Sequence, residues 1–259
     1  ERIRTELEKI MSSQSPSIAW RMMDETDLLD HIVPELTEDR PLRDSVPPIP
    51  DIFGHLLRSC DCAPSDSPVL RWAALLHDVG KPRCFAVDAK GISFAGHDHV
   101  SAEISEGILR RLRFPNSFIL SVAHLVRNHM YGYSSEWSDS AVRRLIARVG
   151  SEELFMLTAL RRIDTCGKWG YVGRSPETEE LESRVKTILE NRPPLSLADL
   201  AIDGRDIMNA LDTGPGPHIG VILRELHQTV IDDPSLNDAT TLTKIAKNIY
   251  VQRIHVDAD

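Results

Sequence analysis

The sequence VLRWAALLHDVGKP, residues 69–82, decides the fold class and indicates where a functional site lies. Its first eight residues are mostly apolar and suit a buried helix, which Gly80 and Pro82 then end. His77 and Asp78 stand side by side at that helix end, where an imidazole and a carboxylate can bind one metal ion together. Lys81, three residues after Asp78, can reach a phosphate bound to that metal. The stretch therefore predicts a helical protein with a metal site at a helix terminus.

The rest of the chain has the same helical character. Nearly every periodic segment has the spacing of a helix, and residues 87–94 alone suggest strands, as a short hairpin. Near the N-terminus, residues 15–17 (SPS) predict the start of a helix that carries Ile18, Met22 and Met23. The expected fold is all-α, a multi-helix bundle with helical segments on either side of it.

Prolines and glycines divide this helical chain into three expected segments. Four prolines lie between positions 41 and 50, where they exclude a helix and mark a linker. A second break falls at residues 173–176 (GRSP). We therefore expect an N-terminal helical segment at 1–45, a metal-binding domain at 46–173 and a C-terminal helical tail at 174–259.

Composition limits the class of protein. The chain has 259 residues, 41% of them hydrophobic and 27% charged, with a net charge of −9, which argues mildly against a dedicated nucleic-acid binder. Residues 110–174 nevertheless hold eleven Lys/Arg against five Asp/Glu, a local basic balance that suits a phosphate-bearing substrate or a solvated helix face. No apolar run approaches the roughly 20 residues of a membrane span. Four scattered cysteines predict reduced thiols in a cytoplasmic protein.

Histidines and aspartates spread over the predicted helices could converge on a metal. Imidazoles and carboxylates together suit one or two divalent ions such as Mn, Ni, Co, Fe or Mg, and helical cores build such sites from several helices. His99 competes with His97, and His124 competes with His129, so these two positions stay open. The candidate ligands are His55, His77, Asp78, His97, His129 and Asp164.

This pattern resembles the HD superfamily of metal-dependent phosphohydrolases, which is named for its His-Asp pair. The superfamily's basic motif of a distant His, the His-Asp doublet and a distant Asp would fall on His55, His77-Asp78 and Asp164. Members with two metals add two histidines, which would fall on His97 and His129. The resemblance implies an HD-domain bundle.

A second resemblance covers nearly the whole chain. Residues 1–36 are similar to the helical segment that follows the catalytic head of bacterial tRNA nucleotidyltransferases (CCA-adding enzymes) and poly(A) polymerases. Residues 204–226 (GRDIMNALDTGPGPHIGVILREL) are similar to the tail of the same enzymes. The head's Gly-Ser motif with two magnesium-binding aspartates is not found, so no nucleotidyltransferase active site is expected in this chain. We expect either an excised C-terminal part of such an enzyme or a free-standing relative without the head.

The resemblances lead to an expected function. We expect hydrolysis of nucleotide phosphate esters, either 2′,3′-cyclic phosphodiesters or phosphomonoesters, by metal-bound hydroxide. Asp78 and Lys81 would be catalytic, and Lys81 would grip a phosphate oxygen unless it only complements the helix dipole. Arg143 and Arg144 are candidate substrate ligands, of which at most one can face the site because adjacent helix residues point apart.

A binding module is the alternative. In that hypothesis the chain is the tRNA-binding body and tail of a nucleotidyltransferase, and the HD site is structural or vestigial. Residues 214–217 (GPGP) before a helix could present backbone amides to an RNA phosphate, or could be a plain turn. A nucleotide sensor without turnover is a third hypothesis. The expected partners are a nucleotide or an RNA 3′ end, with tRNA and a homodimer left open and no membrane.

Overall fold

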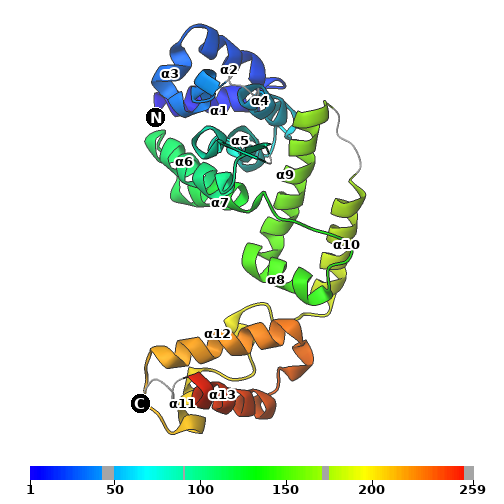
Figure 1. Ribbon diagram of the computed structural model, residues 1–259. Helices are drawn as coiled ribbons and strands as arrows, with labels where there is room; N and C mark the ends of the chain where they lie inside the picture. Colours follow the sequence, from blue (N-terminus) through cyan, green and yellow to red (C-terminus); the bar gives the residue numbers. More distant parts are fainter. Residues whose placement is uncertain (43–49, 90, 171–174, 254–259) are drawn as a thin grey trace. The chain divides into compact units, whose positions relative to one another are not determined.

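The computed structural model describes the chain except for residues 43–49, 90, 171–174 and 254–259. Helices dominate it (Figure 1), so the all-α prediction is confirmed. The expected hairpin is present as β1 (Ala86–Asp88) and β2 (Gly91–Ser93), which pair antiparallel with Ala86 opposite Ser93. No helix in the described ranges is long and apolar enough to cross a membrane.

The described chain forms two compact units. Unit 1 comprises residues 1–132 and 152–178, and unit 2 comprises residues 133–151 and 179–259. The expected segment boundaries at 45/46 and 173/174 lie outside the described residues, so the division into three segments stays a prediction. In the packing of the described residues, the chain leaves unit 1 to contribute residues 133–151 to unit 2 and then returns to unit 1.

Unit 1 contains residues 69–82, in which an apolar stretch ends in the His-Asp pair. Its helices in chain order are α1 (Arg2–Ser12), α2 (Pro16–Glu25), α3 (Leu28–Ile32), α4 (Ile52–Cys62), α5 (Pro68–Leu76), α6 (His97–Arg111), α7 (Asn116–Asn128) and α9 (Ser151–Trp169). Three short 3-10 helices are η1 (Pro34–Thr37), η2 (Arg40–Leu42) and η3 (Lys81–Cys84). The apolar stretch before His77 is the buried helix α5, on which Leu70 to Leu76 are all buried. Large aliphatic and aromatic side chains fill the core around it.

One helix of unit 1 buries only some of its large apolar side chains. Helix α2 begins at Pro16, directly after Ser15, as predicted. It buries Trp20 and Met23, whereas Ile18 and Met22 are 62% and 60% exposed. Trp20 packs edge-on against Trp72 of α5, with ring centroids 6.2 Å apart. The large indole therefore decides which face of α2 packs inward.

Unit 2 is a smaller helical assembly with its own core. Its elements are α8 (Asp139–Val149), α10 (Pro176–Glu190), whose first residues belong to unit 1, η4 (Leu197–Asp199), α11 (Gly204–Leu211), α12 (Pro217–Asp232), η5 (Pro234–Leu236) and α13 (Ala239–Arg253). Aliphatic side chains of α11, α12 and α13 form one buried cluster that includes Ile207, Ile222, Leu226 and Ala246. Helix α11 begins with a capping box, in which the Asp203 carboxylate accepts bonds from the backbone of Arg205 and Asp206.

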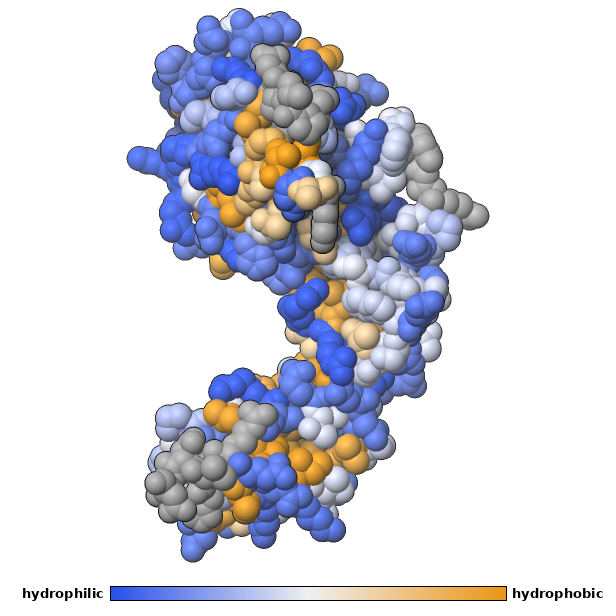
Figure 2. Space-filling view, viewed as in Figure 1, coloured by the Kyte–Doolittle hydropathy of each residue, from blue (hydrophilic) through white to orange (hydrophobic). Residues whose placement is uncertain are grey.

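The visible surface of the chain is mostly hydrophilic with small hydrophobic areas (Figure 2).

Candidate metal centre

Six buried side chains of unit 1 form two adjacent groups that could each hold a metal ion. His55, His77 and Asp164 make the first group, and Asp78, His97 and His129 make the second. They come from five places in the sequence: α4, the residues directly after α5, the start of α6, the residue after α7, and α9. The sequence predicts the same six positions as metal ligands.

In the first group, three atoms face one another closely. The Nε2 atom of His55 lies 3.1 Å from the Nε2 atom of His77 and 3.1 Å from Oδ1 of Asp164. The Nε2 atom of His77 lies 3.4 Å from the same carboxylate oxygen. The three atoms therefore surround a common point.

Asp78 connects the two groups through its two oxygens. Oδ1 lies 3.2 Å from Nε2 of His97 and 3.5 Å from Nε2 of His129. Oδ2 lies 3.5 Å from the Nε2 atoms of both His55 and His77. The carboxylate thus stands between the two groups, in a position to bridge them.

The backbone fixes the tautomer of three of the histidines. Nδ1 of His77 lies 2.9 Å from the carbonyl oxygen of Ala74, and Nδ1 of His97 lies 2.8 Å from that of Phe94. Nδ1 of His129 makes the same contact with Val126 at 2.6 Å. A carbonyl oxygen only accepts, so each Nδ1 carries the proton and donates it. In the neutral ring Nε2 then offers a lone pair, which is the form that binds metals.

The charges of the site support ionised carboxylates. Burial would raise the pKa of Asp78, but His77, His129, His97 and Lys81 hold it well below its usual value. Burial likewise opposes ionisation of Asp164, whereas its bonds with His55, His77 and Lys168 lower its pKa. Burial lowers the pKa of His129, which favours its neutral ring. For His77, burial also favours the neutral ring, but the charge of Asp78 and the bond with Asp164 outweigh it and raise the pKa.

These residues fit a divalent cation. Nε2 of His97, Nε2 of His129 and Oδ1 of Asp164 are buried and make no hydrogen bond of good geometry within the described structure. Buried polar atoms without partners are costly, and lone pairs that face one another repel. A cation at each group would satisfy them, and a set of imidazoles and carboxylates suits ions such as Mn, Fe, Co or Ni.

A pocket of about 530 Å³ opens over both groups. Three cationic side chains line it, namely Lys81, Arg161 and Lys168, together with Phe94 and Met130. Lys81 Nζ lies 2.5 Å from Oδ2 of Asp78, and Lys168 Nζ lies 2.8 Å from Oδ2 of Asp164. Lys81 was predicted at this site from the sequence, whereas Arg161 and Lys168 were missed. Their spacing from Asp164, three residues before and four after, places all three on one side of α9 and could have revealed them.

The structure also places the residues that competed for ligand positions. His97 is buried, whereas the His99 side chain is 64% exposed and lies 3.1 Å from Asp98. His129 is buried within the second group, and His124 belongs to neither group. The geometry therefore favours His97 and His129.

Arg143 and Arg144, the candidate substrate ligands, do not belong to the unit that carries the metal groups. Both lie on α8 in unit 2, where Arg143 donates to the carbonyl oxygens of Ile231 (2.6 Å) and Asp232 (2.8 Å). Arg144 forms an exposed ion pair with the side chain of Asp232. Both arginines therefore hold α8 to the end of α12, a role that one sequence without contacts does not reveal.

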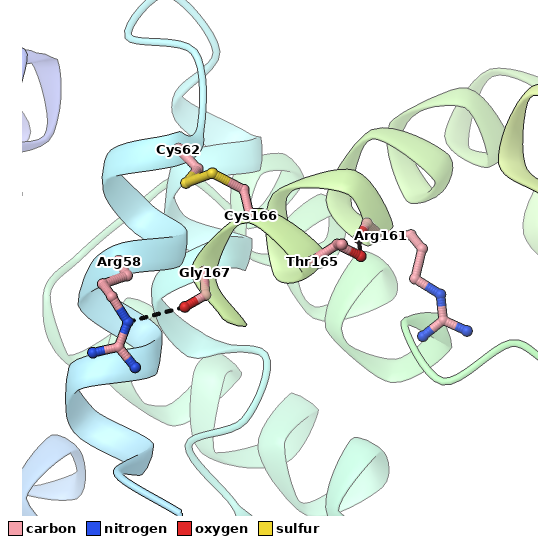
Figure 3. The surroundings of a disulfide bond; sticks show 6 residues. All are labelled: Arg58, Cys62, Arg161, Thr165, Cys166 and Gly167. Carbon is pink, nitrogen blue, oxygen red and sulfur yellow. Dashed lines mark hydrogen bonds between the residues drawn. A yellow bond between two sulfur atoms is a disulfide. The ribbon is translucent and has the colours of Figure 1, made fainter. Parts of the chain in front are cut away.

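A disulfide next to the metal groups corrects the prediction that all cysteines are reduced. Cys62 at the end of α4 is bonded to Cys166 on α9 (Figure 3). Nearby, Nε of Arg58 donates to the carbonyl oxygen of Gly167 at 2.9 Å. A Cβ atom at Gly167 would lie 2.0 Å from Oγ of Ser59, so glycine is needed for this close approach. The prediction failed because the two cysteines are 104 residues apart and only the fold brings them together.

Comparison with known protein families gives two matches. A family model described as "tRNA nucleotidyltransferase domain 2 putative" matches residues 96–246. A second model, described as "Probable RNA and SrmB- binding site of polymerase A", matches residues 1–40. In unit 1 the two models match residues 1–40, 96–132 and 152–178. In unit 2 the first model matches residues 133–151 and 179–246.

Curated relatives match over most of this chain. An A-adding tRNA nucleotidyltransferase from Deinococcus radiodurans is 34% identical over 240 residues, which is 87% of this chain and 53% of the relative. A CC-adding tRNA nucleotidyltransferase from Thermus thermophilus is 33% identical over 241 residues, 87% of this chain and 51% of the relative. A multifunctional CCA protein from Xanthomonas campestris is 26% identical over 234 residues. The chain spans about half the length of these relatives.

Proposed function

The chain belongs to the tRNA nucleotidyltransferase family, and from that premise we propose that it is the tRNA-binding body and tail of such an enzyme. The observation that carries this proposal is the similarity over 87% of the chain to proteins whose names describe nucleotide addition to tRNA. An enzyme that adds nucleotides to tRNA must hold the tRNA while it acts. The matched description of residues 1–40 as a probable RNA-binding site supports the same role for unit 1.

The prediction that the chain is a metal-dependent phosphohydrolase is wrong. The relatives are named as nucleotide-adding enzymes, and both matching models describe nucleotidyltransferase or polymerase segments. The error has a physical reason. A set of histidines and aspartates specifies that a cation can bind, whereas the reaction depends on groups that such a set does not contain.

Within the proposed function, the metal groups are structural. Divalent cations at the two groups would supply positive charge between buried lone pairs and carboxylates, with His55, His77 and Asp164 at one and Asp78, His97 and His129 at the other. Those residues lie on or next to five helices of unit 1, so the bound cations would fix α4, α6 and α9 around α5 and α7. Residues 1–40, with their RNA-binding description, belong to the same unit. Metal binding would thereby stabilise the unit that holds RNA.

Cationic side chains give this acidic chain local surfaces for an RNA backbone. The wall formed by Lys81, Arg161 and Lys168 is one such surface within unit 1. Phosphate contacts dominate the affinity of RNA-binding proteins and release counterions, so binding weakens as salt rises. The net charge of −9 opposes this attraction at long range, and salt screens that repulsion as well, so the slope reports chiefly the local phosphate contacts.

The test is direct binding of tRNA to the purified chain. Fluorescence anisotropy with labelled tRNA, measured from about 50 to 200 mM salt, should show binding that weakens along a straight log–log line. A DNA duplex of equal charge serves as the control and should bind more weakly. Absence of tRNA binding at the lowest salt, with a folded and metal-loaded sample, would overturn the proposal.

A further inference from the structure

A second cavity in unit 1, lined by none of the residues of the metal pocket, has no assigned role. Its volume is about 250 Å³. Helix α1 contributes Glu8 and Met11 to its lining, and α5 contributes Pro68 and Trp72. Phe114, just before α7, and Phe118, on α7, complete the apolar lining. Pockets for drug-sized ligands occupy about 300–1,000 Å³, so this cavity suits a smaller group.

Aromatic rings form one side of the cavity. Phe114 and Phe118 are stacked, with ring centroids 4.8 Å apart and planes 18° apart. Trp72 meets Phe114 edge-on at 5.1 Å and is almost fully buried. Phe118 is only half-buried, so the outermost ring of this stack remains accessible to a further planar group.

The cavity is held in shape by a buried arginine. The Arg71 guanidinium donates to the carbonyl oxygens of Met11, Ser13 and Ala63, and only 2% of this residue is exposed. These bonds join the end of α1 and the residue after α4 to α5. The walls are therefore fixed before any ligand binds, which lowers the entropic cost of binding.

The polar residues that line the cavity are Glu8, Ser12 and Ser65, and the Arg4 guanidinium lies beside Glu8. The Glu8 side chain is 48% exposed, and its Oε2 lies 3.5 Å from Nε of Arg4. Arg4 lies over the Phe114 ring, 5.7 Å from its centroid, and donates to the carbonyl oxygen of Arg113. Arg113 is exposed and holds a left-handed backbone conformation, with φ at 65°. A hydrogen-bond acceptor thus adjoins the aromatic wall, with positive charge beside it.

We propose that this cavity receives one unstacked nucleobase of a bound RNA, and the inference rests on the proposed function. The base would continue the aromatic stack on Phe118, as single-stranded RNA bases do on aromatic side chains. Glu8 would accept a hydrogen bond from an exocyclic amino group, which adenine, cytosine and guanine carry and uracil lacks. Arg4, which lies beside Glu8 and over Phe114, would be near a phosphate that flanks the base. The helix α1 that carries Glu8 falls within the segment described as a probable RNA-binding site.

The experiment compares Phe118→Ala with Leu120→Ala on the same helix. Leu120 is 63% exposed and does not line the cavity, so it is a matched control. Affinity for tRNA and for short single-stranded oligo-A, oligo-C and oligo-U is measured by anisotropy. Phe118→Ala should weaken binding about 5- to 150-fold, Phe118→Tyr should retain it, and Leu120→Ala should leave it unchanged.

A second variant tests the carboxylate. Glu8→Gln keeps the shape of the side chain but removes its charge, and it should reduce the preference for oligo-A and oligo-C over oligo-U. Equal affinities of Phe118→Ala and Leu120→Ala in folded samples would overturn the cavity proposal while tRNA binding by the unsubstituted chain stands. Failure of the unsubstituted chain to bind tRNA would overturn the proposed function instead. Binding of an apolar peptide, but no effect of Phe118→Ala on RNA, would identify a protein side chain as the occupant and overturn the base assignment.

Discussion

Cys166, which lies two residues after Asp164, forms a disulfide with Cys62. A covalent link therefore adjoins a candidate metal ligand. The linked helices, α4 and α9, carry His55 and Asp164, whose Nε2 and Oδ1 atoms lie 3.1 Å apart. The covalent bond and the metal group therefore join the same two helices.

Removal of this disulfide should lower the free energy of unfolding. A bond that closes a loop of about 100 residues stabilises a protein by about 3–5 kcal/mol, mainly by restricting the unfolded chain. The double variant Cys62→Ser/Cys166→Ser, or treatment with a reductant, should shift the urea midpoint downward. Cys84→Ser, at a free cysteine, is the control and should keep the original midpoint. Identical midpoints with and without reductant would contradict the prediction.

Loss of a ligand should lower the metal content. His97→Ala removes one member of the second group, whereas His99→Ala, two residues away, removes an exposed ring. Elemental analysis of protein purified without chelator should give less metal for His97→Ala and the original content for His99→Ala. The melting temperature of the metal-loaded protein should fall for His97→Ala and stay unchanged for His99→Ala, because a metal that binds only the folded state stabilises it. Full metal content in both variants would exclude His97 as a ligand.

Two neighbouring arginines in unit 2 should differ in their effect on stability. Arg143 donates to two carbonyl oxygens at the end of α12, and its loss should cost about 1–2 kcal/mol. Arg144 forms an ion pair whose side chains are 49% and 48% exposed, and its loss should cost less than about 0.5 kcal/mol. Chemical unfolding of Arg143→Ala and Arg144→Ala measures the difference. Equal losses would mean that the backbone bonds of Arg143 contribute little.

The cap of α11 should give unit 2 part of its acid sensitivity. Backbone bonds from Asp206 and Arg205 lower the pKa of Asp203 in the folded state. Its stabilising effect is therefore present above the unfolded pKa of about 3.9 and is lost as the pH falls through the lower folded value. Asp203→Asn keeps a capping side chain without the titration. Melting temperatures measured from pH 7 to pH 2.5 should fall less steeply for this variant, and parallel curves would contradict the assignment.

Local signals in the sequence predicted much of the fold and of the ligand set. Residues 69–82 predicted the buried helix α5 and its end at His77, because apolar content and a Gly-Lys-Pro sequence act locally. The hairpin near residue 90 and the start of α2 after Ser15 are also local features, and both are confirmed. All six predicted ligands lie in the two metal groups, although their role as ligands stays a prediction.

Features that depend on distant contacts were not predicted. The buried face of α2 follows from the contact of Trp20 with Trp72, which lies 52 positions away. The roles of Arg143 and Arg144 depend on α12, almost ninety residues later. The prediction of phosphate ester hydrolysis was wrong because the spacing of histidines and aspartates indicates that a cation can bind and does not indicate the reaction. The two structural features depend on residues far away in the sequence, and the reaction depends on groups other than the metal ligands.

The positions of the metal ligands along the chain have a consequence for the order of folding. The first group combines residues 55, 77 and 164, and the chain between the last two includes a helix that belongs to unit 2. Contacts between such distant residues form slowly, because long loops must close before any contact compensates the lost entropy. The first group is thus complete only when α9 has returned to unit 1. Metal capture at that group would then be a late step, and its rate would report the completion of unit 1 during refolding.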